Sequence, residues 1–185
     1  MPLKVYQKKR NFKKTPEPAG KKSTSKKLLY IMHKHDASHL HYDLRLSWQG
    51  VLKSWAVPKG PSYDPHEKRL AIEVEDHPLS YASFEGVIPQ GEYGGGTVML
   101  WDKGTWEPIE DPAAGLKKGK LIFSLQGKKL KGEWSLIKTA LPGAKPSWLL
   151  IKKTDEYANA IKDKDLLNTV SVKTGRGMQE IQDNE

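Results

Sequence analysis

The hydrophobic residues of this chain fall in short runs separated by clusters of Gly, Pro, Asp and Lys, a pattern typical of β proteins. From Leu28 onward, the pattern predicts about eight strands at the spacing of a β-sandwich or a β-barrel. The predicted strands are Leu28–Met32, Leu40–Trp48, Leu52–Val57, Leu70–Val74, Thr97–Trp101, Lys120–Leu125, Gly132–Lys138 and Trp148–Lys152. The segment Asp155–Val170 is the only one that predicts a helix, on the surface or as a cap of the body.

The second predicted strand alternates apolar and polar residues. Its even positions are apolar, and His39, His41, Asp43 and Arg45 occupy the odd positions. Side chains two residues apart project from the same face of a strand, so we expect His41, Asp43 and Arg45 to form one polar row. A neutral His and an ionised Asp can bind one metal ion, whereas the guanidinium of Arg45 suits phosphate. Because imidazole and carboxylate ligands suit Mn, Fe or Zn, the row predicts metal-dependent phosphoester chemistry.

The spacing leaves the third metal ligand open between His35 and His39. His35 has the same parity as the row, but it lies too far along a straight strand to reach the same ion. The turn-forming residues Asp36–Ser38 would bring His35 closer if they bend the chain. A solvated strand face rich in His is the simpler interpretation. It is the weaker one, because His33–Arg45 holds four of the six histidines of the chain.

A second polar row is predicted in the strand that ends at Pro78. Its odd positions would share one face: Arg69, Glu73, Glu75 and His77. Because Pro78 ends the strand, His77 lies where catalytic groups often occur and could donate a proton or contact a phosphoryl group. A lone His is more often a surface residue. Lys59 is equally open, either as a cation for a ligand or as part of the turn Pro58–Pro61.

The composition excludes several classes of protein. The length of 185 residues fits one domain with a hydrophobic core of its own. The chain has no Cys, which excludes thiol catalysis, Cys-ligated zinc and disulfide bonds. No apolar run is long enough to span a membrane, and the N-terminus has no signal-peptide pattern, so we expect a soluble intracellular protein.

The net positive charge of the chain lies in its N-terminal arm. Residues 1–27 hold ten Lys or Arg and one acid, Glu17, whereas residues 28–185 hold 21 residues of each sign. Such an arm binds polyanions by releasing condensed counterions. A solubilising tail is the usual alternative, but an arm that precedes a phosphate site favours a nucleic-acid partner. The segment Lys21–Lys27 is predicted to be a flexible linker between the arm and the body.

The segment Pro89–Gly96 is predicted to be a long loop with several left-handed positions. Its glycines suggest a phosphate cradle, but the loop lacks the Gly-Lys-Ser/Thr ending of a P-loop and no helix is predicted after it. We therefore interpret the loop as structural.

Several blocks of the sequence resemble a known family. The blocks are His35–Ser38, Leu40–Leu46, Gly50–Pro61, Val74–Leu79 and Phe84–Pro89. In order and spacing they are similar to the 3′-phosphoesterase domain of bacterial DNA ligase D and its stand-alone relatives, with a resemblance that runs from about Lys9 to Gly177. The resemblance implies a mainly β fold: a compact closed β-barrel at 28–185, one or two short surface helices, and a basic arm at 1–27 that contributes to the active site.

The resemblance also implies an enzyme that trims damaged or ribonucleotide-bearing 3′ ends of DNA before end joining. Such an enzyme removes a 3′-terminal ribonucleoside as a phosphodiesterase and then the 3′-phosphate as a phosphomonoesterase. Mn²⁺ is the implied metal, with Co²⁺ or Zn²⁺ as other occupants. The implied site residues are His35, His41 and Asp43 for the metal; Arg45 and His77 at the scissile phosphate; Lys59, Arg69 and Tyr81 as further phosphate-pocket residues; and Arg10, Asn11 and Glu17 from the arm.

Three residues depart from the pattern of the family. Asn11 stands where the family usually has Asp, so one charge of the arm is absent. His33 stands where Gln is more usual, either as an additional donor in the pocket or as an incidental substitution. His39 stands where relatives often have Arg, which argues against His39 as a ligand and selects His35.

On this basis we expect the substrate to be a DNA or RNA–DNA primer-template 3′ end, in the cytoplasm at the nucleoid. A DNA ligase, a polymerase and a Ku-type end-joining protein are the candidate partners, and no membrane is involved. The chain itself has no Lys-x-Asp-Gly motif of a ligase. The alternative from another class is a non-catalytic nucleic-acid-binding barrel, in which the arm binds phosphates and the histidines have no catalytic role.

Overall fold

Nine antiparallel strands form one sheet in residues 2–143 and 145–184, which the computed structural model describes. The strands are β1 (Leu29–Asp36), β2 (Leu40–Trp48), β3 (Val51–Val57), β4 (Arg69–Pro78), β5 (Gly86–Ile88), β6 (Gly96–Pro108), β7 (Lys120–Gly127), β8 (Lys131–Lys138) and β9 (Ser147–Lys152). Their order is β1-β2-β3-β4-β9-β8-β7-β6-β5, and pairing between β1 and β6 closes eight of them into a barrel. The predicted mainly β fold with a closed barrel is therefore confirmed.

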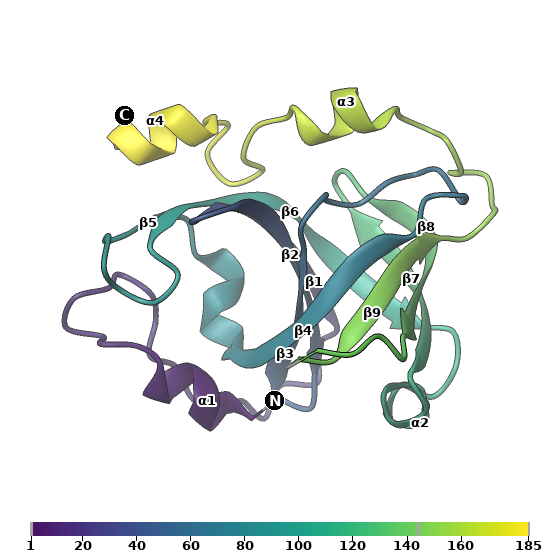
Figure 1. Cartoon of the computed structure of the whole chain (residues 1–185), viewed down its shortest axis with the longest axis horizontal. Helices are drawn as coiled ribbons and strands as arrows, with labels where there is room; N and C mark the ends of the chain where they lie inside the picture. The colour runs from purple at the N-terminus through teal and green to yellow at the C-terminus, as the bar shows by residue number, and fades with distance from the viewer. Residues whose placement is uncertain (1, 144, 185) are drawn as a thin grey trace.

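The helices of the described chain are short. They are α1 (Leu3–Lys8), the 3₁₀-helix η1 (Leu79–Ser83), α2 (Pro112–Lys118), α3 (Asp163–Leu167) and α4 (Met178–Asp183). Figure 1 shows β7, β8 and β9 on one side of the molecule, α1 and η1 on the other, and α3 and α4 across the top. Among the described residues, no helix has the length and apolar character needed to cross a membrane.

The predicted helix at Asp155–Val170 is wrong over most of its length, because only α3 within it is helical. The carboxylate of Asp155 accepts hydrogen bonds from the backbone N–H groups of Glu133 and Tyr157, so it holds the start of this segment in a turn against β8. Asn159 has a positive φ of 57°, which interrupts a right-handed helix. These tertiary contacts replace the helix that local propensity predicts.

The strand β6 is longer than the predicted strand Thr97–Trp101, and the short β5 that pairs with it was not predicted. β6 continues past Asp102, a charged residue that ordinarily ends an apolar run. The carboxylate of Asp102 is buried and accepts hydrogen bonds from the hydroxyl of Tyr30 and the backbone N–H groups of Lys129 and Leu130. Because its acceptors are satisfied by other strands and loops, the charge is tolerated inside the fold.

Two hydrophobic clusters cover the two faces of the strands that carry the polar row. The larger cluster fills the barrel and includes Tyr42, Leu44 and Leu46 of β2. The smaller one contains Tyr6, Leu52, Tyr81, Phe84, Ile88 and Val98. Asp43 and Arg45 alternate with the barrel residues of β2, yet both are buried. The polar row therefore lies in a covered cleft and is not a solvated strand face.

A β-bulge in β4 changes which residues face this cleft. Two steps along β3 correspond to three steps along β4, from Val74 to His77. The prediction that the odd positions from Arg69 to His77 share one face is therefore wrong. Val74 and His77 both line the cleft, whereas Ala71 packs in the barrel core. A period of two cannot reveal the extra residue, because a bulge is defined by pairing with the partner strand.

The basic arm is packed against the barrel. Tyr6 of α1 is fully buried, and its hydroxyl donates a hydrogen bond to the carbonyl oxygen of Pro18 at 2.5 Å. Farther along, the backbone N–H of Ser23 donates to the carbonyl oxygen of Gly50 in the turn between β2 and β3. The arm is thereby placed beside the cleft. The division of the chain into an arm at 1–27 and a barrel domain at 28–185 stays a prediction.

Candidate active site

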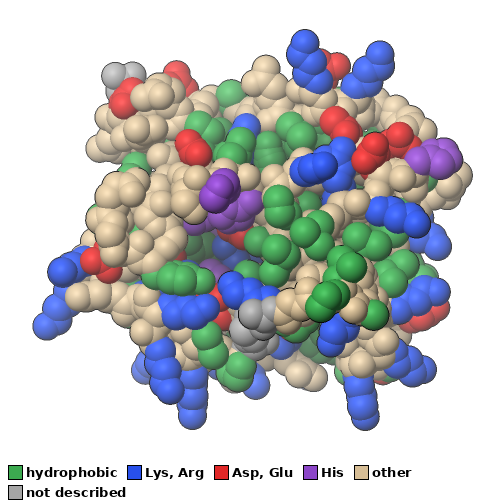
Figure 2. Space-filling model, in the orientation of Figure 1, with side chains coloured by type: hydrophobic (Ala, Val, Ile, Leu, Met, Phe, Trp, Pro, Cys, Tyr) green, Lys and Arg blue, Asp and Glu red, His purple; other side chains and the backbone are tan. Residues whose placement is uncertain are grey.

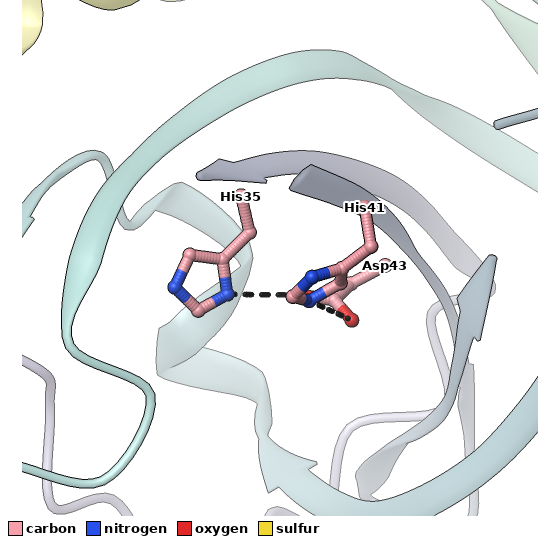
Figure 3. A group of neighbouring side chains, drawn as sticks. All are labelled: His35, His41 and Asp43. Carbon is pink, nitrogen blue, oxygen red and sulfur yellow. Dashed lines mark ion pairs between the residues drawn. The ribbon is translucent and has the colours of Figure 1, made fainter. Parts of the chain in front are cut away.

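The three predicted metal ligands lie together at one end of β1 and β2. His35 and His41 are directly paired across these strands, and Asp43 follows on the same face of β2. One ligand atom from each residue can be chosen so that all three lie within 4.8 Å of one another. Figure 3 shows both imidazole rings directed toward the carboxylate of Asp43. The hairpin connection at residues 37–39 makes this possible, because it folds His35 back against His41.

The hydrogen bonds of the two imidazoles suit metal binding. Nε2 of His35 lies 2.7 Å from the carbonyl oxygen of Gly94, and Nδ1 of His41 lies 2.9 Å from that of His39. A carbonyl oxygen only accepts, so these nitrogens carry the ring protons and donate them. The lone pairs are then on Nδ1 of His35 and Nε2 of His41, which face Asp43 at 3.7 and 3.5 Å. Metal-binding histidines in proteins are oriented by the same kind of bond.

Asp43 is held in its ionised form. Burial alone would raise the pKa of this carboxyl, but the positive charge of Arg45 and the neighbouring imidazoles of His35 and His41 hold the pKa well below its usual value. For His41, burial would lower the pKa, and Asp43 outweighs this effect and raises it. With both imidazoles neutral, the three side chains offer two imidazole nitrogens and one carboxylate, a donor set that fits Mn²⁺, Co²⁺ or Zn²⁺.

Arg45 lies beside the three predicted metal ligands and is anchored on three sides. Its Nη2 donates to Oδ2 of Asp43 at 3.2 Å, its Nη1 to Oγ of Ser54 at 2.9 Å, and its Nε to Nδ1 of His33 at 3.2 Å. The guanidinium also lies over the ring of Tyr81, 4.9 Å from its centroid. These bonds use three of the five N–H groups of a guanidinium, so the planar donor that phosphate requires is held rigidly.

His77 is the second imidazole system of the cleft. Its Nδ1 donates to the carbonyl oxygen of Glu75 at 2.9 Å, and its Nε2 lies 3.4 Å from Nη2 of Arg10. Burial, together with the positive charges of Arg45 and Arg10, holds the pKa of His77 well below its usual value. His77 is therefore neutral, with the lone pair of Nε2 on the side of Arg10.

The arm contributes Arg10 and Glu17 to the same cleft. Nε of Arg10 lies 2.9 Å from Oε2 of Glu17, and its Nη1 lies 3.2 Å from Oε1 of Glu75. The hydroxyl of Tyr81 donates to Oε2 of Glu17 at 2.9 Å. Burial and the charge of Glu17 raise the pKa of Tyr81 well above its usual value, so Tyr81 stays protonated as a donor. Arg10 also lies over the ring of Tyr6, 3.9 Å from its centroid.

Together these groups line a cavity of about 210 Å³. Its lining includes eight of the predicted site residues: Arg10, Glu17, His35, His41, Asp43, Arg45, His77 and Tyr81. Figure 2 shows histidine side chains gathered in a hollow of this face, with Lys and Arg side chains beside and below them. The functions of these residues stay predictions, but their convergence from the arm, three strands and η1 is a property of the fold.

Three other predicted site residues lie outside the lining of this cavity. Arg69 is on the β4 face opposite the cleft, where its guanidinium pairs with Asp163 and donates to the carbonyl oxygen of Lys59 at 2.9 Å. The side chain of Lys59 is exposed. Oδ1 of Asn11 accepts the backbone N–H of Lys13 at 3.1 Å, so the side chain stabilises a local turn. The phosphate-pocket roles predicted for Lys59 and Arg69, and the place of Asn11 in the active site, stay predictions.

Sequence reasoning missed several residues of the cleft and left one open. Glu75, Tyr93 and Lys145 line the cavity but were assigned no role there. His33 was left as a pocket donor or an incidental substitution. Its Nε2 donates to the carbonyl oxygen of Phe84 at 3.0 Å, and its Nδ1 accepts from Arg45, so it positions the guanidinium. Burial and the neighbouring Arg45 lower the pKa of His33 to about 3, so it is neutral.

Comparison with known proteins assigns this chain to a family. The profile of the DNA ligase D 3′-phosphoesterase domain matches residues 33–138, more than half of the chain. The chain belongs to this family. The DNA ligase D 3′-phosphoesterase domain is a hydrolase acting on phosphoester bonds, so the resemblance read from the sequence is confirmed at this level.

Two relatives place the DNA ligase D family in end joining. The chain is 54% identical over 169 residues to the multifunctional non-homologous end joining protein LigD of Pseudomonas aeruginosa. The aligned residues make up 90% of this chain and 20% of the relative. It is 43% identical over 142 residues to the multifunctional non-homologous end joining DNA repair protein LigD of Mycobacterium tuberculosis. Here the aligned residues make up 74% of this chain and 18% of the relative. The chain thus spans about a fifth of the length of these curated relatives.

Proposed function

We propose that the chain heals 3′ ends of DNA by removing 3′-terminal ribonucleosides and then 3′-phosphates, and leaves 3′-hydroxyl ends for repair and end joining. The observation that carries the proposal is the convergence of two anchored imidazoles and the carboxylate of Asp43 beside Arg45. Membership of a phosphoesterase family supports the reaction class. The names of the relatives, which are end-joining proteins, support a DNA end as the substrate.

The donor set supports a divalent metal, with Mn²⁺ as the preferred ion. His35, His41 and Asp43 would hold it. When bound, such an ion polarises a non-bridging phosphate oxygen as a Lewis acid. Because both imidazoles are oriented by carbonyl oxygens, the chain needs little rearrangement to bind the ion.

The chemistry of the two steps is the same at phosphorus. The oxygen of a water molecule forms a bond to phosphorus as the bond to the leaving oxygen breaks, and the leaving oxygen takes up a proton. In the first step the leaving oxygen is the 5′-oxygen of the terminal ribonucleoside, and a 3′-phosphate stays on the strand. In the second step it is the 3′-oxygen of the strand, and inorganic phosphate is released.

The residues of the chain supply binding, charge and proton transfer. The rigid guanidinium of Arg45 would bind the phosphoryl oxygens, and Arg10 would offset the charge that develops on them. His77, whose Nε2 lies on the side of Arg10, would either stabilise the transition state or protonate the leaving oxygen. Glu17 and Glu75 orient Arg10, which is why the arm belongs to the proposed site.

The test uses a primer-template whose primer strand ends in ribonucleotides and a second one that ends in a 3′-phosphate. With Mn²⁺, the wild-type protein is expected to shorten the first and dephosphorylate the second. His41→Ala should lose both activities by at least about a hundredfold, because it removes a metal ligand. His39→Ala is the matched control, since the exposed His39 contributes its backbone oxygen, which the substitution keeps.

Absence of turnover with Mn²⁺, Co²⁺ and Zn²⁺, with DNA binding intact, would contradict the enzyme proposal and favour a non-catalytic nucleic-acid-binding barrel. We further propose that the chain acts in the cytoplasm at the nucleoid with a DNA ligase, a polymerase and a Ku-type protein. The support is that the relatives are multifunctional end-joining proteins. Co-precipitation of these proteins with the tagged chain, in the presence of a nuclease, tests for direct contact.

A further inference from the structure

Tyr93 lies at the mouth of the cleft and has no part in the chemistry proposed above. It lines the same cavity as His35, His41 and Asp43, yet 41% of its surface is exposed. Among the large hydrophobic residues that are exposed in the described chain, Tyr93 is the only aromatic one. An exposed ring at the entrance of a polar cavity is a suitable surface for a flat ligand.

The ring of Tyr93 is held in a defined position relative to the three predicted metal ligands. The next residue, Gly94, has a positive φ of 74°, and its carbonyl oxygen is the one that accepts the Nε2 proton of His35. On the side of the arm, Nζ of Lys9 donates to the hydroxyl of Tyr93 at 3.3 Å, and Arg10 lies 5.1 Å from the centroid of the ring. The ring therefore connects the loop that orients a metal ligand to the arm that contributes Arg10.

The two proposed steps differ in what lies beyond the phosphate. In the phosphodiesterase step, the phosphate bears a ribonucleoside, and its base must lie outside the polar cavity. In the phosphomonoesterase step, no nucleoside is present on that side. A residue that contacts the base therefore contributes to the first step alone, whereas Arg10, Arg45 and His77 face the phosphate in both.

We propose that Tyr93 is the stacking platform for the base of the 3′-terminal ribonucleoside. The inference rests on the proposed function, because it assigns a subsite to its first step. Stacking on an aromatic ring is available to every base, since each base has a π-face, so Tyr93 favours a nucleoside without selecting its identity. The cations of Lys9 and Arg10 keep the ring in place and attract the nearby phosphate.

The competing explanation is that Tyr93 only fastens the arm. In that case, replacement of Tyr93 would displace Arg10, which faces the phosphate in both steps, and the two activities would fall together. The ratio of the two activities therefore separates the explanations.

The experiment compares wild type, Tyr93→Ala and Tyr93→Phe in kcat/KM on the ribonucleotide-ended and the 3′-phosphate-ended primer. Tyr93→Ala is expected to lower the ratio of phosphodiesterase to phosphomonoesterase activity about tenfold, the usual size of one stacking contact. Tyr93→Phe should keep the ratio, because it keeps the ring and loses only the hydroxyl. An equal fall of both activities in Tyr93→Ala overturns the inference and leaves the proposed function standing.

Two further measurements test the base itself. Wild type should discriminate between a terminal ribonucleoside and an abasic ribose about tenfold, and Tyr93→Ala should lose this discrimination. Without metal, a terminal 2-aminopurine ribonucleoside should lose fluorescence on binding to wild type and not to Tyr93→Ala. If wild type turns over neither primer, the proposed function fails. The fluorescence still decides for or against Tyr93, since equal quenching by both proteins overturns the inference.

Discussion

Nε of Arg45 donates a hydrogen bond to Nδ1 of His33 at 3.2 Å, deep in the cleft. His33 is held in turn by the carbonyl oxygen of Phe84, to which its Nε2 donates at 3.0 Å. The two bonds define the tautomer of His33, because Nε2 must carry the proton and Nδ1 must accept. A buried His thereby sets the plane of the guanidinium that is proposed to bind phosphate.

Replacement of His33 tests this relationship. His33→Ala leaves a buried N–H of Arg45 without its acceptor, so we expect a loss of about 1–3 kcal/mol in the free energy of unfolding. We also expect a fall of roughly tenfold in kcat/KM on both substrates, which denaturant titration and rate measurements would detect. His33→Gln should restore both, since its side chain offers an oxygen to Arg45 and an N–H to Phe84. A Gln variant as impaired as the Ala variant would contradict the assignment.

The bond between Gly94 and His35 predicts a defect in metal affinity for Gly94→Ala. At the positive φ of 74°, a Cβ costs roughly 1–2 kcal/mol of backbone strain, and relief of that strain turns the carbonyl oxygen away from His35. We expect Mn²⁺ to bind about tenfold or more weakly, as measured by calorimetry. Gly91→Ala is the matched control, because Gly91 has a φ of 88° and no atom near its Cβ position. Equal losses in both variants would refute the role of the carbonyl.

The environment of Glu75 predicts a pH-dependent stability. Burial would raise the pKa of Glu75, but its own backbone N–H and the charges of Arg10 and Lys9 lower it below the usual 4.5. A carboxyl with a lowered folded-state pKa stabilises the fold above pH 4.5, and this contribution is lost as the pH falls through the folded-state pKa. Glu75→Gln should therefore cost about 1–2 kcal/mol at pH 7 and progressively less below pH 4.5.

The measurement for Glu75 is urea unfolding of wild type and Glu75→Gln between pH 3 and pH 7. The Gln side chain keeps an oxygen that can accept from Arg10, so the comparison isolates the charge. A difference between the two proteins that does not change with pH would argue against the titration of Glu75 as its cause.

The candidate metal site of His35, His41 and Asp43 predicts that Mn²⁺ stabilises the fold. A ligand that binds only the folded state adds about 2.7 kcal/mol at a hundred times its dissociation constant. We expect the melting temperature of wild type to rise with Mn²⁺ and return to its initial value on addition of a chelator. Asp43→Asn should abolish the rise, whereas His66→Ala should keep it, since the side chain of His66 is 94% exposed and pairs with Asp64. An unchanged rise in Asp43→Asn would exclude this trio as the site.

Much of the barrel could be predicted because strand periodicity is a local property. The alternation along β2 correctly separated the barrel residues Tyr42 and Leu44 from Asp43 and Arg45. The same reasoning failed on β4, where the bulge before His77 reverses the parity. The helix predicted at Asp155–Val170 failed for another reason: tertiary hydrogen bonds to Asp155 hold a turn that helical propensity does not reveal.

By itself, the sequence determined the β class, the position of the candidate site segment at His33–Arg45, and the concentration of positive charge in the arm. These features depend on residue type and short spacing. Only the tertiary structure decided that the carbonyl oxygen of Gly94 orients His35, that His33 orients Arg45, and that Tyr93 stands at the cleft mouth. These are contacts between strands, loop and arm, and their partners are far apart along the chain. Their geometry arises only when β1 and β6 close the barrel.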